Sequence, residues 1–153
     1  MQGVNISLLL ALSLLLLNFL KMEYKIQYEY LNKYIFGGKA DIILKDIRNN
    51  DYINFCVLKN NKNFVVYYKT FKLIKIGEIK YSNDFVILEP FKQNLDKDYT
   101  KIFIKFFNII FIDKKIPNNI EVYYTGKCSI CGRTLKNPKY IEIGIGVECL
   151  KKL

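Results

Sequence analysis

The stretch ADIILKDIRNNDYINFCVLKNNKNFVVYYKTFKLIKIGEIKYSNDFVILE, residues 40–89, decides the fold of this chain. It contains four or five runs rich in β-branched and aromatic residues, separated by short clusters of Asn, Asp, Ser and Lys. These connections permit hairpins but are too short for the crossover helices that a parallel sheet needs. We therefore predict a small antiparallel β-meander from the runs at residues 40–47, 52–58, 63–71, 72–79 and 85–89.

Two helices are expected around this meander. Apolar spacing from Tyr28 to Phe36 suits a short helix, and Gly37 and Gly38 supply the left-handed positions that end one. The segment from Asp96 to Asp113 predicts a helix with one broad apolar face that covers the sheet. An aromatic stripe of this kind also suits stacking of single-stranded bases, but we favour core packing. The stripe consists of Tyr99, Ile102, Phe103, Phe106, Phe107 and Ile110.

Three of the four cysteines lie together in the C-terminal segment. Cys128 and Cys131 form a CxxC pair, and Cys149 follows after seventeen intervening residues. In a zinc knuckle, such a pair sits on a tight turn whose amides point at sulfur, and Gly132 can adopt the positive φ that this turn demands. We predict that these three thiolates bind one structural Zn²⁺.

The last residues, GVECLKKL at 146–153, predict a short terminal helix after Gly144 and Gly146. Cys149 would lie near its first turn, where amide dipoles stabilise a thiolate. The fold class predicted for the whole chain is therefore α+β: a small antiparallel β-meander covered by one aromatic-rich helix, with a C-terminal zinc-knuckle module that ends in a short helix.

Two other interpretations of the CxxC pair are open. One is a surface turn with two free thiols. The other is a redox pair of thioredoxin type, which belongs at a helix N-terminus, whereas Gly132 interrupts a helix here and a third cysteine lies downstream. Cys56 lies among apolar residues of a predicted strand, and we assign it to the core as a small hydrophobic residue.

The cysteine motif resembles a family of uncharacterised domains that bacteriophages and other mobile elements encode. The resemblance rests on CSICGRTLKNP at residues 128–138 and GIGVEC at residues 144–149. It extends more loosely upstream, where relatives carry a strand start like Gly38-Lys39-Ala40, a β-meander and an aromatic helix. What the resemblance implies is a small protein of phage or mobile-element type with a zinc site at these cysteines.

Many members of that family place a histidine four residues before the first cysteine, which implies a Cys₃His site. This chain has Tyr124 at that position. A structural zinc site normally closes with four protein ligands, so the fourth ligand is open. The candidates are a carboxylate such as Glu142 or Glu148, the thiol of Cys56, a water molecule, or a residue of another chain.

The N-terminal run from Ile6 to Leu20 is mostly apolar and falls short of the roughly twenty residues that span a bilayer. Three interpretations are open: a marginal membrane anchor, a buried helix, and a start site set too early, with Met22 as the true start. As an anchor it would leave the remaining chain in the cytoplasm, because the first lysines follow it. The predicted division is residues 1–22, an α+β body at 23–117, and a zinc-binding tail at 118–153.

Charge and composition reduce the number of possible function classes. The net charge of +10 favours a phosphate-bearing partner, although only Arg48 and Arg133 among the 24 basic residues are arginine. The chain has no histidine, which excludes His-based acid or base catalysis and His-ligated metal sites. We therefore expect a protein that is not an enzyme, and a CxxC metal site fits a reducing cytoplasm.

Three function hypotheses follow. The preferred one is a non-enzymatic zinc-binding protein that binds nucleic acid through basic residues around the zinc site, namely Lys127, Arg133, Lys136 and Lys139. The alternative is a protein-directed inhibitor of a host defence nuclease, like an anti-CRISPR protein, whose partner is a host nucleic-acid-processing protein. The lesser alternative is an accessory protein that residues 6–20 tether to a membrane.

Overall fold

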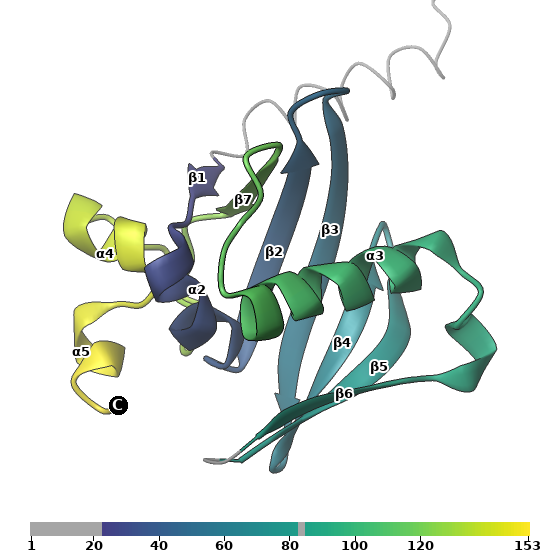
Figure 1. Cartoon of the computed structure of the whole chain (residues 1–153). Coiled ribbons are helices and arrows are strands. Elements are labelled where there is room, and N and C mark those ends of the chain that lie inside the picture. Colours follow the sequence, from purple (N-terminus) through teal and green to yellow (C-terminus); the bar gives the residue numbers. More distant parts are fainter. Residues whose placement is uncertain (1–22, 83–84) are drawn as a thin grey trace, which may run out of the picture.

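A seven-stranded antiparallel sheet organises the part of the chain that the computed structural model describes, residues 23–82 and 85–153. The strand order is β1-β7-β2-β3-β4-β5-β6 (Figure 1). The predicted α+β class with an antiparallel meander is confirmed, and its strands are β2 (Lys39–Asp46), β3 (Asp51–Asn60), β4 (Asn63–Lys69), β5 (Leu73–Tyr81) and β6 (Val86–Pro90).

Tight turns between the meander strands explain the short polar connections of the sequence. Asn60 pairs with Asn63 across the β3–β4 turn, and Asn61 takes a positive φ of 55° there. Asn50 has a φ of 60° in the turn between β2 and β3. Asparagine tolerates this left-handed region better than most residues, so the polar clusters fix where each hairpin reverses.

Two further strands extend the sheet beyond the predicted meander. β7 (Ile120–Tyr124) pairs antiparallel with β2, and β1 (Tyr24–Lys25) pairs with β7 at the sheet edge. β7 belongs to the predicted tail, yet it lies between β1 and β2 in the sheet. The cysteines therefore follow directly from a strand that the sheet holds in place.

The helices occupy two places in Figure 1. α3 (Asp98–Asn108), which continues into a π-helical turn (Ile109–Asp113), crosses in front of the strands. α2 (Tyr28–Ile35), α4 (Pro138–Ile143) and α5 (Val147–Leu150) lie together beside the edge that carries β1 and β7. A 3-10 turn (Lys92–Asn94) precedes α3.

Aromatic contacts join α3 to the sheet. The ring of Phe103 lies edge-on to that of Phe55 in β3 at 5.0 Å, and Tyr99 stacks on Tyr68 in β4 at 4.5 Å. Alternate residues of β2 point to this side and are buried, because side chains along a strand alternate between the two faces. The buried members of this core on β2 and α3 are Ala40, Ile42, Leu44, Phe103, Phe106 and Phe107.

Among the described residues, no helix is long and apolar enough to cross a membrane. The N-terminal run from Ile6 to Leu20 lies outside the described residues.

Candidate metal centre

Cys128 and Cys131 lie on a tight loop that leaves the end of β7, and we refer to residues 126–135 as the cysteine loop. Three backbone hydrogen bonds close it: Leu135 N donates to Gly126 O at 2.8 Å, Cys128 N to Arg133 O at 2.9 Å, and Gly132 N to Cys128 O at 2.9 Å. These bonds fold the CxxC pair back on itself, so both thiols project from the same turn.

The turn depends on a glycine after the second cysteine. Gly132 has a φ of 78°, as the sequence predicted, in the region where side chains with a Cβ are strained. A Cβ at this position would meet nothing closer than 3.7 Å, at Lys39 Cδ. Backbone conformation, rather than lack of space, therefore selects glycine here.

A second turn brings Cys149 to the loop. α4 begins at Pro138, and Asn137 caps it by accepting a hydrogen bond from Lys139 N at 3.0 Å. It ends at Gly144, whose φ is 78°. The carbonyl of Gly144 accepts from Ser129 N at 3.0 Å, which ties the turn to the cysteine loop. α5 follows at once and carries Cys149.

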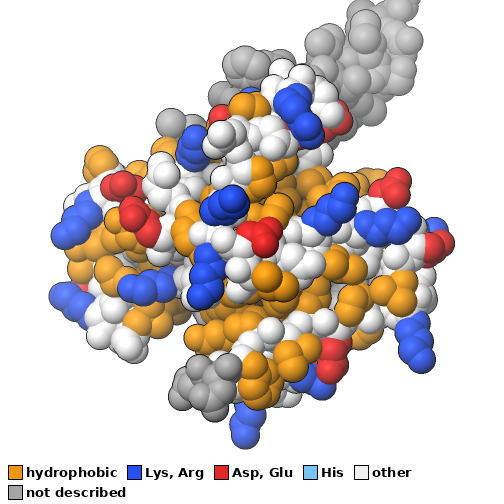
Figure 2. All heavy atoms as spheres, viewed as in Figure 1, with side chains coloured by type: hydrophobic (Ala, Val, Ile, Leu, Met, Phe, Trp, Pro, Cys, Tyr) orange, Lys and Arg blue, Asp and Glu red, His pale blue; other side chains and the backbone are white. Residues whose placement is uncertain are grey.

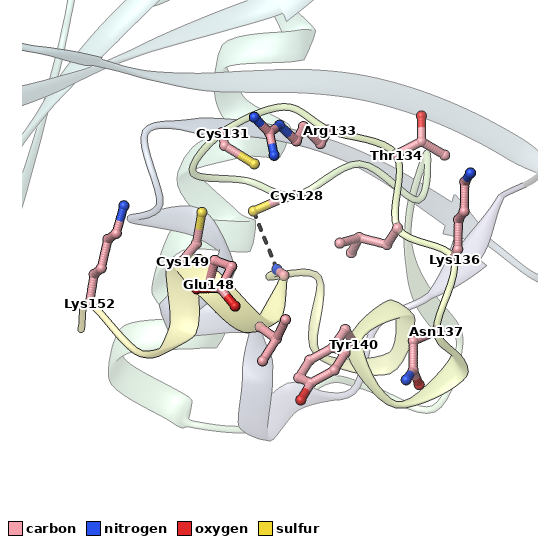
Figure 3. A pocket seen from close by; sticks show the side chains of 13 residues that line it. Cys128, Cys131, Arg133, Thr134, Lys136, Asn137, Tyr140, Glu148, Cys149 and Lys152 are labelled. Carbon is pink, nitrogen blue, oxygen red and sulfur yellow. Dashed lines mark hydrogen bonds between the residues drawn. The ribbon is translucent and has the colours of Figure 1, made fainter.

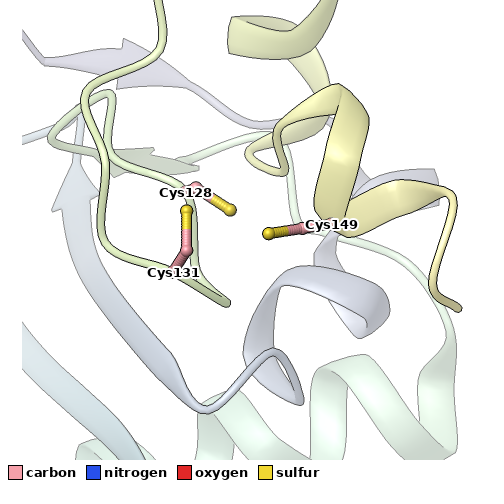
Figure 4. A group of neighbouring side chains, drawn as sticks. All are labelled: Cys128, Cys131 and Cys149. Atoms are coloured by element: carbon pink, nitrogen blue, oxygen red, sulfur yellow. The ribbon is translucent and has the colours of Figure 1, made fainter.

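The structure brings the three predicted cysteines together (Figure 4). The sulfur atoms of Cys128, Cys131 and Cys149 all lie within 4.8 Å of one another, and all four cysteines of the chain are free thiols. Three sulfurs this close can serve as ligands of one metal ion, because thiolates bind soft and borderline cations at about 2.3 Å. The cluster can therefore hold a single metal ion.

Backbone amides favour the thiolate at Cys128. This residue is only 1% exposed, and its sulfur accepts a hydrogen bond from Gly146 N at 3.4 Å. Burial alone would raise the pKa of the thiol, but amide hydrogen bonds from Cys131, Gly146 and Ile130 outweigh it and lower the pKa to about 7. Such amide donors are what a metal-bound sulfur requires from its surroundings.

Cys149 shows the opposite shift. Burial raises the pKa of its thiol to about 11, and the neighbouring sulfurs of Cys131 and Cys128 act in the same direction. Thiolates held this close repel one another when no cation lies between them. Binding of a divalent cation would remove this repulsion and release protons from the cluster.

The predicted candidates for a fourth ligand lie in different surroundings. Cys56 is 6% exposed in β3, and burial raises the pKa of its thiol to about 11, as expected for a core residue. Tyr124, which lies four residues before Cys128 and is not one of these candidates, is fully buried, and its hydroxyl donates a hydrogen bond to the carbonyl of Ile141. Glu142 is exposed, whereas Glu148 lines the same cavity as the cysteines and pairs with Lys151 at 3.6 Å.

No other Cys, Asp or Glu among the described residues joins the three cysteines in their cluster. The sequence adds weight to this observation, because residues 1–22 contain none of these residue types. Asp84 is the one carboxylate of the chain that lies outside the described residues.

The three thiols open onto a cavity of about 430 Å³ with cationic side chains around it (Figure 3). Arg133, Lys136 and Lys152 line the cavity together with the apolar side chains of Leu135 and Val147. Of the predicted basic rim, Lys127, Arg133, Lys136 and Lys139 are all exposed. Figure 2 shows that Lys and Arg side chains also spread over the rest of the visible face, with hydrophobic side chains between them.

Sequence reasoning missed α4 and Lys152. Asn137-Pro138 is a recognisable helix start, because asparagine caps and proline suits the first helical position, and Gly144 is a recognisable stop. These signals could have located α4. Nothing in the sequence pattern points to Lys152, which lines the cavity in a structure where α5 lies next to the cysteine loop.

Comparison of the chain with protein-family models, with curated proteins and with solved structures finds no match.

Proposed function

We propose that Cys128, Cys131 and Cys149 bind one Zn²⁺ ion that holds the tail in its folded form. The observation that supports the proposal is the approach of three sulfurs to within 4.8 Å on a loop whose amides stabilise thiolate. Zinc suits an all-sulfur donor set, and it binds strongly in tetrahedral geometry without redox chemistry. The C-terminal module is then a zinc knuckle closed by the short helix α5.

We infer that the fourth ligand is a water molecule or a donor from another molecule. Glu142, Glu148 and Cys56 do not belong to the cluster of three sulfurs, and the Tyr124 hydroxyl donates to a backbone carbonyl. Substitution of Co²⁺ for zinc provides a direct reading, because its visible absorption depends on the donor set. A spectrum of three sulfurs and one oxygen or nitrogen that stays the same in Glu142→Gln and Glu148→Gln would support the inference, and a spectrum that changes in either variant or in Cys56→Ala would overturn it.

As to function, we propose a non-enzymatic protein of phage or mobile-element type that binds nucleic acid at the zinc site. The observation that supports it is the group of exposed cations Arg133, Lys136 and Lys152 around the cavity. Among the described residues, no ion pair engages any of the three. Free lysine and arginine side chains on a rigid support are suited to contact phosphate.

Titration of the full chain with single- and double-stranded DNA and RNA at rising salt tests this function. We expect affinity to fall steeply with salt, and the slope to shrink by about one for each phosphate contact removed. Arg133→Gln with Lys136→Gln should weaken binding, whereas Lys92→Gln with Lys101→Gln, an equal charge change at exposed positions outside the cavity, should change it less. Absence of binding at low salt would reject the function.

A second candidate function, protein-directed inhibition of a host nuclease, has one observation in its favour. The β5–β6 hairpin exposes the large apolar side chains of Phe85 and Ile87, which are alternate residues and so point to the same side. Exposed apolar groups in one place are typical of protein contacts. Capture of a partner from host lysate should survive nuclease treatment if this function holds, and Phe85→Ser with Ile87→Ser should abolish the capture. Loss of capture on nuclease treatment would favour the nucleic-acid function.

A further inference from the structure

β2 and β7 diverge next to the cysteine loop. The two strands pair from Asp46↔Ile120 to Ile43↔Tyr123 and then separate. Beyond this point, the backbone of β2 forms hydrogen bonds with a side chain and with the cysteine loop instead of with β7. The Tyr34 hydroxyl donates to Asp41 O and accepts from Asp41 N, both at 3.0 Å, and Lys39 N donates to Ser129 O at 2.6 Å. We call the space between the separated strands the fork.

The fork contains a cavity of about 590 Å³. Its walls come from five separate parts of the chain: Tyr24 of β1, Tyr34 of α2, Lys39 and Asp41 of β2, Lys69 of β4, and the cysteine loop, which contributes Lys127. Cys128 and Leu135 line both this cavity and the one at the metal centre. The volume lies within the range of small-molecule sites, roughly 300–1,000 Å³.

Cations outnumber anions in the fork. Lys39, Lys69 and Lys127 line the cavity, and Asp41 is the one acid among the lining residues. Lys69 forms an ion pair with Asp41, whereas Lys39 Nζ lies 3.5 Å from the carbonyl of Cys131 and Lys127 is exposed. Among the described residues, no ion pair engages the ammonium groups of Lys39 and Lys127, and lysine is a common phosphate-binding residue in proteins.

Asp41 carries a carboxylate oxygen that lacks a hydrogen-bond donor within the described part of the chain. One of its oxygens accepts from Lys69, but the other, Oδ1, is buried and has no hydrogen-bond partner among the described residues. A buried carboxylate oxygen without a donor is unfavourable, and an N–H group of a ligand would satisfy it. The aromatic ring of Tyr24 borders the same space and offers contact to a flat ring, whereas Tyr34 is 1% exposed and its ring packs against Tyr124.

Phosphate, an N–H donor and a flat ring occur together in a nucleotide. We propose that the fork binds a single nucleotide, with its phosphate on Lys39 and Lys127 and an N–H group of its base on Asp41. This inference rests on the proposed nucleic-acid function and assigns it a specific binding site, the fork. The nucleotide is either one unit of a bound strand or a free nucleotide, since both offer the same chemistry.

Calorimetric titration of the zinc-loaded full chain with the monophosphates of adenosine, guanosine, cytidine and uridine tests the proposal. At least one monophosphate should bind, and it should bind more tightly than inorganic phosphate or the bare nucleoside. Lys39→Gln with Lys127→Gln should weaken binding at least about tenfold, because each loses a charge-assisted contact to phosphate. Asp41→Asn should weaken it too, whereas Lys92→Gln with Lys101→Gln should leave it unchanged.

The outcomes separate this inference from the proposed function. If a single-stranded oligonucleotide displaces the monophosphate, the source is a strand; if it does not, the source is a free nucleotide, and the fork site stands in either case. If no monophosphate binds, or if the double lysine variant binds as well as the wild type with its metal content and melting temperature intact, the inference is overturned. Salt-dependent binding of oligonucleotides would then still support the proposed function.

Discussion

The sheet and the cysteine tail keep their shape by different means. The residues from 23 to 117 hold most of the buried apolar side chains, including the aromatic contact of Phe55 with Phe103. Beyond residue 117, the buried hydrophobic residues among those described are Val122, Tyr124, Cys128 and Ile145. α4 has six residues and α5 has four, too few to persist alone in water. Burial can hold the sheet, whereas the tail buries few apolar side chains, and the proposed metal ion between three sulfurs would cross-link it.

The largest expected effect comes from removal of the metal. Zinc binding to structural cysteine sites contributes on the order of 10 kcal/mol. In the Cys128→Ser variant, or after stringent chelation, amides of the tail such as Gly132 N and Leu150 N should lose protection from hydrogen exchange. Amides of β3 and β4 should keep theirs. Equal protection of both regions before and after metal removal would contradict the comparison.

Loss of the aromatic contact in the body should act on the other region. Phe103→Ala should lower the free energy of unfolding by about 3–5 kcal/mol in urea titrations, because it leaves a cavity between α3 and β3. Metal content should stay the same. Lys101→Ala, at an exposed position of the same helix, is the control and should change stability by less than about 0.5 kcal/mol.

Two glycines with the same φ of 78° allow a sharper test within the tail. A Cβ at Gly144 would lie 2.5 Å from Tyr34 Cδ2, whereas one at Gly132 would have ordinary contacts. Gly132→Ala should therefore cost about 1–2 kcal/mol for the left-handed backbone alone, and Gly144→Ala should cost more. Thermal unfolding of both zinc-loaded variants measures the difference. Equal losses would show that Tyr34 does not restrict the turn.

The smallest expected effect is a difference in acid sensitivity: as the pH is lowered, the tail should release its metal before the sheet unfolds. Protons compete with the metal for the thiolates, so metal affinity falls as pH decreases. In the body, hydrogen bonds from Arg48 lower the pKa of Asp46 from 3.8 to about 2. The stabilisation from that carboxylate is complete above pH 3.8 and is lost only as the pH falls towards 2. Released metal, measured with a colorimetric chelator, should therefore precede the loss of β-sheet circular dichroism as the pH is lowered.

The sequence predicts the meander well because each strand carries its own local signal. Runs such as YINFCVL at residues 52–58 are β-branched and aromatic, and polar turns border them. β1 has two residues and β7 has five. β7 pairs with β2 and β1 pairs with β7, and both pairings join segments that are remote in sequence. Local pattern cannot supply long-range pairing, so these strands were missed.

The same distinction applies to the site. Cys128, Cys131 and Gly132 are neighbours in sequence, and this short motif predicts a metal-binding turn. The structure brings Cys149 to the two cysteines of that turn, as predicted. The fork was out of reach, because Lys39, Lys69 and Lys127 come from three separate elements that only the folded sheet brings together. A motif with short spacing can be predicted from sequence, whereas a cavity between strands cannot.

Metal stoichiometry tests the central claim most directly. Native mass spectrometry and elemental analysis of the purified chain should find one zinc ion per molecule. Cys128→Ser, Cys131→Ser and Cys149→Ser should each lower zinc retention after dialysis, whereas Cys56→Ala, at a buried cysteine outside the cluster, should retain the ion. A wild-type protein without stoichiometric metal, or zinc retained equally in all four variants, would contradict the account.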